Sequence, residues 1–169
     1  MARITARTEA PRLSPAARAE LEDIYRRVDQ EIASSGVCCW LRSQCCDFEA
    51  NDHVLYASSA ELAYVLEGHP EPFEPTGVQC PFWVDGLCTE RRRRPLGCRT
   101  YYCDERYREP LEAICEKYHG EVRELSERHG IPYRYKPFVA SLRDVEPRCA
   151  SLEEASPGDT GRALGGSGS

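Results

Sequence analysis

Cysteine placement constrains this chain more than any other feature of its sequence. Eight of its ten cysteines fall into two short blocks: Cys38, Cys39, Cys45 and Cys46, then Cys80, Cys88, Cys98 and Cys103. Thiolates are the ligands that hold zinc and iron–sulfur centres, whereas a core built for packing alone has no reason to gather cysteines. The sequence therefore predicts a fold organised around a cysteine-ligated metal centre.

A disulfide framework is the main alternative explanation for these blocks. The first residues, MARITARTEAPRLSP, are polar and charged and lack the apolar stretch of a signal peptide. This start predicts a cytoplasmic protein, and thiols stay reduced in that compartment. With 169 residues and 41% hydrophobic content, the chain is also long enough to pack a domain without disulfides. Metal binding is the favoured interpretation.

Charge and hydropathy exclude two classes of partner. The formal net charge is −6, with 28 acidic against 22 basic residues, which disfavours general nucleic-acid binding. No apolar run approaches the roughly 18 to 20 residues needed to cross a bilayer. We therefore expect neither a nucleic acid nor a membrane as a partner.

Helical signals dominate the pattern of apolar and capping residues. They predict helices over about 15–34, 58–67 and 109–129, a short strand over 53–57, a tight turn at 85–86 and an extended segment over 131–142. The predicted fold is mainly α with long irregular loops and little β, in a single small domain. Its expected limits are a flexible N-terminus at 1–13, a cysteine-cluster domain at 14–143, and a disordered tail with linker-like residues at 144–169.

The second cysteine block carries a specific resemblance. Cys80-Pro81, Cys88, Arg94-Pro95, Cys98-Arg99 and Cys103 resemble the pattern C-P, C, R-P-x-x-C-R and C of the YkgJ-like cysteine-cluster proteins, a family described as zinc- or iron-chelating domains. In the first block Cys39, Cys45 and Cys46 match the first, third and fourth cysteines of the family's C-x-x-C-x-x-C-C pattern, and Arg42 stands at the second. Cys38 is a candidate replacement for the ligand missing at Arg42. The resemblance covers roughly residues 36–142 and implies a metal or iron–sulfur centre.

The choice of metal follows from ligand spacing. A tetrahedral zinc site commonly uses two C-x2-4-C knuckles, and among these cysteines Cys98 and Cys103 alone have such a spacing, as C-x4-C. A [4Fe-4S] cluster accepts thiolates from separate loops, so iron–sulfur is favoured and Zn²⁺ is the alternative. The candidate ligands are Cys38, Cys39, Cys45, Cys46, Cys80, Cys88, Cys98 and Cys103. Because they exceed the four that one cluster needs, the sequence leaves open one centre or two.

Five arginines surround Cys98, four of them in the run 91–94. A solvated charge run is the plain interpretation. Alternatively, these guanidinium groups stabilise the negative charge of a thiolate-bound cluster, and Arg94 and Arg99 are the best candidates because both occupy motif positions. The same arginine-rich loop is a candidate docking site for an unknown protein partner. Cys115 falls on an apolar helix stripe and is predicted to be a core residue.

Three classes of function fit these features. The leading hypothesis is a small iron–sulfur protein that carries electrons or senses redox state. The second is a zinc- or iron-chelating structural or metal-handling module, as the family description implies. The third is a cluster-dependent modifying enzyme, because a similar cysteine arrangement occurs in flagellin lysine N-methylases that use S-adenosylmethionine. The sequence does not decide whether the protein is an enzyme.

Overall fold

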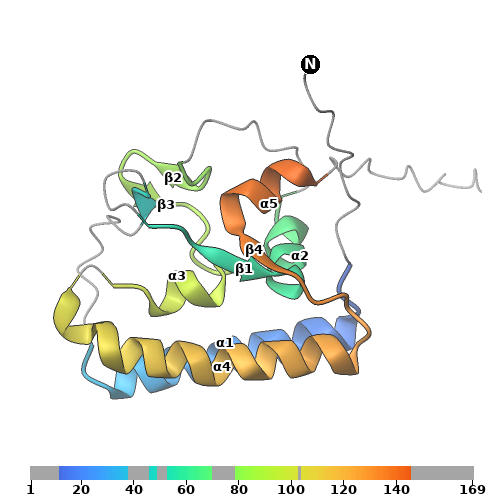
Figure 1. Ribbon diagram of the computed structural model, residues 1–169, viewed down its shortest axis with the longest axis horizontal. Helices are drawn as coiled ribbons and strands as arrows, with labels where there is room; N and C mark the ends of the chain where they lie inside the picture. The colour runs from blue at the N-terminus through green and yellow to red at the C-terminus, as the bar shows by residue number, and fades with distance from the viewer. Residues whose placement is uncertain (1–11, 38–45, 49–52, 70–78, 103, 146–169) are drawn as a thin grey trace, which may run out of the picture.

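Two long antiparallel helices form the base of the structure (Figure 1). The structure is a computed structural model and describes residues 12–37, 46–48, 53–69, 79–102 and 104–145. Helix α1 spans Pro15–Ser34, and helix α4 spans Arg108–Arg128. Ion pairs join their outer faces, with Arg27 to Glu121 at 2.5 Å and Lys117 to Glu31 at 2.6 Å.

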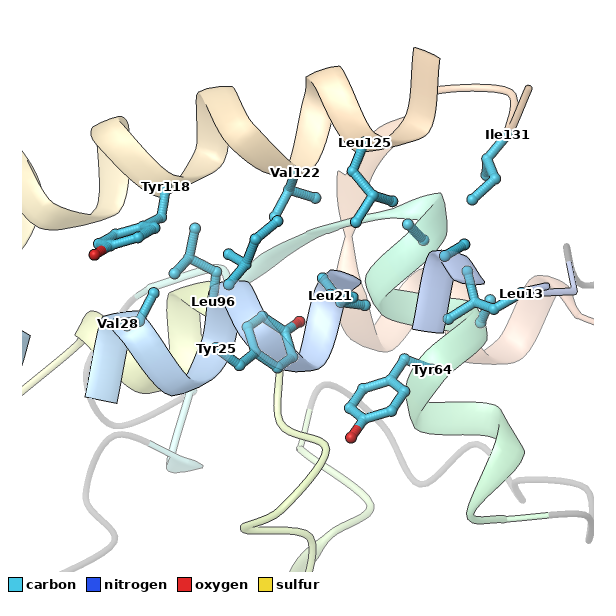
Figure 2. Close-up of a cluster of buried hydrophobic side chains, with 14 of the residues drawn as sticks. Leu13, Leu21, Tyr25, Val28, Tyr64, Leu96, Tyr118, Val122, Leu125 and Ile131 are labelled. Atoms are coloured by element: carbon cyan, nitrogen blue, oxygen red, sulfur yellow. The ribbon is translucent and has the colours of Figure 1, made fainter. Parts of the chain in front are cut away.

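The sequence at its N-terminal end explains why α1 begins at Pro15. The Ser14 hydroxyl accepts a hydrogen bond from the Ala17 amide at 3.1 Å, and Pro15 occupies the first turn, where its missing N–H is not needed. One apolar stripe is buried against α4, on which Val122 and Leu125 point towards α1 (Figure 2). Periodic apolar burial of this kind supplies most of the stability of a surface helix.

A second layer of short elements lies on one side of this pair. Strand β1, Tyr56–Ser58, pairs antiparallel with β4, Tyr135–Pro137, and each strand leads directly into a helix. These helices are α2, Ser59–Glu67, and α5, Phe138–Asp144. Strands β2, Trp83–Val84, and β3, Leu87–Cys88, form a hairpin at the far side of this layer, and α3, Leu96–Thr100, lies between the hairpin and the helix pair (Figure 1). The 3-10 turn η2, Glu105–Tyr107, leads into α4.

The interior is divided into two apolar clusters. The helix-pair core lies around α1 and α4 and contains Leu13, Ala17, Leu21, Ile24, Tyr25, Val28, Ile32, Ala60, Ala63, Tyr64, Leu96, Leu111, Ile114, Tyr118, Val122, Leu125 and Ile131. The thiol-side core contains Cys46, Phe48, Leu55, Ala57, Leu62, Val65, Leu66, Cys80, Phe82, Phe138 and Leu142. Helix α2 contributes to both, and every residue from 59 to 66 is buried. Helix α2 therefore lies between the two clusters and packs against both.

Most predicted elements are confirmed. The expected helices over 15–34, 58–67 and 109–129 correspond to α1, α2 and α4, and the described residues are mainly helical with two-stranded sheets. The predicted strand over 53–57 is displaced, because β1 pairs at 56–58. The predicted extended segment over 131–142 is wrong in its second half, where 138–144 is helical. The expected tail at 144–169 and the N-terminus at 1–13 lie almost entirely outside the described residues.

No helix in the described part of the chain is both long and apolar enough to span a membrane.

Candidate metal centre

Four of the predicted ligands line one cavity. Cys46, Cys80, Cys88 and Cys98 all border a space of about 40 Å³, which we call the thiol cavity. They reach it from different parts of the chain: Cys80 precedes β2, Cys88 ends β3, and Cys98 lies within α3. Cys46 and Cys80 are buried, while Cys88 and Cys98 are partly buried. All four are free cysteines.

The β2–β3 hairpin brings Cys80 and Cys88 to the cavity. Asp85 and Gly86 take positive φ values of 49° and 76°, as a two-residue type I′ turn requires. The resulting register sets Cys88 opposite Trp83, whose amide donates to the Cys80 carbonyl at 3.0 Å. The tight turn predicted at 85–86 is therefore confirmed, and so is its effect on these two cysteines.

A buried carboxylate fixes the helix that carries Cys98. The Leu96 amide, at the start of α3, donates to Oε1 of Glu61 at 2.7 Å. Glu61 is 1% exposed and belongs to α2, so this bond ties α3 to the wall between the two cores. Gly97 packs so closely that an added Cβ would lie 2.7 Å from the Leu55 Cδ1 atom. The position of Cys98 is thus set by contacts of the two residues that precede it.

The surroundings of Cys88 favour a thiolate. A hydrogen bond from Cys46 is the main cause that lowers the pKa of Cys88, to about 6. The Glu90 amide and the positive charges of Arg94 and Arg91 act in the same direction, while burial opposes them. Metal ligation requires the deprotonated sulfur, so this environment suits a ligand.

The two motif arginines lie in different surroundings. Arg94 lines the thiol cavity, and its Nε atom is buried without a hydrogen-bond partner among the described residues. Arg99 is buried and donates to Asp29 at 2.6 Å and to the carbonyls of Arg92 and Arg94 at 2.5 and 3.1 Å. Its guanidinium also lies 4.1 Å from the centre of the Tyr25 ring. Arg99 therefore stabilises the backbone of residues 91–94, which we call the arginine loop, and it does not line the thiol cavity.

One residue of the cavity lining was missed by the sequence reasoning. Glu90 is buried in the lining and accepts from the Arg93 amide at 2.8 Å, while its other oxygen lies 2.6 Å from His69 Nε2. Tyr101 also lines the cavity, and its ring stacks on His53 with the ring centres 4.3 Å apart. No sequence signal separated Glu90 from its charged neighbours.

The other cysteines divide into two groups. Cys38, Cys39, Cys45, Cys103 and Cys149 lie outside the described residues. Cys115 packs against the helix-pair core, as predicted from its place on the apolar stripe, and burial raises the pKa of its thiol. Among the described residues, no group of three or more His, Cys, Asp or Glu side chains is arranged to hold a single metal ion.

Comparison with known proteins identifies no matching family model, no matching curated protein and no matching solved structure.

Proposed function

We propose that this protein binds an iron–sulfur cluster at the thiol cavity and serves in electron transfer or redox sensing. The observation that supports the proposal most is the meeting of Cys46, Cys80, Cys88 and Cys98, from separate elements, at one cavity. Four thiolates are the usual ligand set of a [4Fe-4S] cluster. The YkgJ-like resemblance is part of the same proposal, because all four residues occupy motif positions.

The arrangement of donors favours a cluster over zinc. A structural zinc ion needs its ligands to converge on one point, with each sulfur about 2.3 Å from the metal. A cluster is held at separate iron atoms, each taking its own thiolate, so the four sulfurs need only surround a common space. Of the cysteines outside the described residues, Cys38, Cys39, Cys45 and Cys103 remain candidates for this centre or a second one.

Orphaned donors near the cavity fit a sulfur-rich, negatively charged group. Trp83 Nε1 and Arg94 Nε are buried, and neither has a hydrogen-bond partner within the described chain. A buried donor without a partner costs about 1 to 3 kcal/mol, so an acceptor is expected nearby. Cluster sulfur accepts such bonds, and hydrogen bonds and charge at sulfur set the reduction potential. Apolar walls from Phe48, Phe82 and Phe138 would limit the access of water.

The remaining elements of the proposal follow from this chemistry. The bound cluster would supply reversible one-electron chemistry, while the chain's own residues hold it, shield it and adjust its charge. A reducing compartment such as the cytoplasm suits reduced thiols. The arginine loop, at the edge of the thiol cavity, is where we propose that an acidic protein partner docks.

The test is to purify the protein without oxygen and measure iron, acid-labile sulfide and zinc per chain. We expect about four iron and four sulfide, with broad absorption near about 400 nm. The Cys98→Ser variant should lose most of the iron. Cys115→Ser is the matched control, because the same atom is replaced in a thiol that packs against the other core. Zinc without sulfide, or equal iron in the two variants, would refute the proposal.

A further inference from the structure

An open cleft of about 600 Å³ lies between α1 and the arginine loop. Its volume is within the range of small-molecule sites in proteins. Four arginines and two carboxylates line it: Arg26, Arg91, Arg92 and Arg99, with Glu22 and Asp29. We call this space the arginine cleft. It is positive in a chain whose formal net charge is −6, so it departs from the average charge of the molecule.

Most of these charges are already engaged within the protein. Asp29 is paired with Arg99 at 2.6 Å, and Glu22 accepts a hydrogen bond from the Tyr64 hydroxyl at 2.8 Å. Arg26 reaches back along its own helix to Asp23 and to Gln30. Neither Arg91 nor Arg92 forms an ion pair or side-chain hydrogen bond within the part of the chain that the structure describes. Both guanidinium groups can therefore form hydrogen bonds with a ligand in the cleft.

Hydrogen bonds from the buried Arg99 side chain stabilise the backbone of the loop that carries these two arginines. Arg99 donates to the backbone carbonyls of Arg92 and Arg94, and its own side chain is only 5% exposed. It rests on the ring of Tyr25, which packs edge-on against Tyr64 with the ring centres 5.9 Å apart. Tyr25 belongs to α1 and Tyr64 to α2 (Figure 2). Because the backbone is fixed in this way, binding an anion would order only the two exposed side chains.

We propose that the arginine cleft binds a small anionic ligand through Arg91 and Arg92. Guanidinium groups pair with carboxylate and phosphate oxygens through two parallel hydrogen bonds, so either chemistry suits the cleft. An arginine contributes more binding free energy when it does not first have to break an existing ion pair. Arg91 and Arg92 meet this condition within the described part of the chain. The inference goes beyond the proposed cluster, because it requires no metal. Arg91 also lines the thiol cavity and so connects the two sites.

The test uses inorganic pyrophosphate and citrate as probes, titrated calorimetrically into the purified full chain at constant ionic strength. We expect saturable binding of one anion per chain, and an affinity at least tenfold weaker in Arg92→Gln and in Arg91→Gln. Both side chains are exposed, so these variants should fold normally. Arg123→Gln is the control: its charge change is identical, but its side chain is 66% exposed on α4 and pairs with Glu127.

Each outcome bears on the proposal. Binding of pyrophosphate alone would support it and assign a phosphate-bearing ligand, while binding of citrate alone would support it and assign a carboxylate. No saturable binding of either probe would overturn it, and so would equal weakening in Arg92→Gln and Arg123→Gln. Iron content is measured on the same samples. A chain that lacks iron but binds the anion would refute the cluster proposal alone.

Discussion

Replacing Glu61 would remove one acceptor from three donors at the junction of α1, α2 and α3. Its Oε1 atom accepts from the Leu96 amide at 2.7 Å and from the Tyr25 hydroxyl at 3.3 Å. Its Oε2 atom accepts from the Ser58 amide at 2.7 Å and so completes the capping box of α2. All three bonds are buried.

The magnitudes follow from counting the donors left unsatisfied. Each orphaned buried donor costs about 1 to 3 kcal/mol. Glu61→Ala orphans three but also removes a buried carboxylate that is unfavourable to desolvate, so we expect a net loss of about 3 to 5 kcal/mol. In Glu61→Gln the amide oxygen can serve the two donors of Oε1, while its NH₂ group faces the Ser58 amide. One donor is then lost, and we expect a loss of about 1 to 3 kcal/mol.

Urea denaturation followed by circular dichroism measures these differences. Glu124→Gln is the control, because its side chain is 68% exposed on α4 and should change the free energy of unfolding by less than about 0.5 kcal/mol. If Glu61→Gln were as stable as the wild type, or if alanine and glutamine had equal effects, the hydrogen-bond reasoning would be refuted.

Three further predictions concern the helix pair and the hairpin. Leu125 is fully buried between the helices, so Leu125→Ala should lower the free energy of unfolding by about 2 to 5 kcal/mol, measured in urea. Gly120→Ala on α4 meets open space and should raise the melting temperature through a gain of about 0.5 to 1 kcal/mol, whereas Gly86→Ala, at φ +76°, should lower it. Hydrogen bonds, first from His129, lower the pKa of Glu20, so its contribution is present above about pH 4.5 and is lost as the pH falls through its folded value. Glu20→Gln should therefore lose less stability than the wild type between pH 5 and 3, by about 0.2 to 1 kcal/mol in acid titrations, because this exposed pair is screened.

Local signals in the sequence were sufficient for the three main helices. Ser14-Pro15 marks the start of α1, and the pairing of Ser58 with Glu61 marks the start of α2, because both are contacts between residues close in the chain. The strands and α5 were harder. The position of β1 is set by pairing with β4, and Tyr56 opposes Pro137 from far along the sequence. Aromatic residues led to the prediction that residues 138–142 are extended. The segment is helical instead, and the helix buries Phe138 and Leu142 together in the thiol-side core.

The sequence likewise predicted one part of the candidate site and not the other. Motif spacing identified Cys46, Cys80, Cys88 and Cys98, and the structure brings them to one cavity. Spacing gave no reason to connect Arg99 to Asp29, because that pair depends on how α3 packs against α1. The electrostatic role predicted for Arg99 is untested, while its contacts show that it shapes the loop around Arg92 and Arg94.

The double-sided burial of α2 has a consequence for how the protein would acquire its cluster. Ala60, Ala63 and Tyr64 belong to the helix-pair core, which contains none of the four cavity cysteines. Under the proposed function, that half would assemble without iron, and the opposite face of α2 would then be available for the cysteine half to pack against. Under the proposed function, a cell short of iron would accumulate chains that are half built and still competent to be loaded, rather than unfolded chains destined for proteolysis.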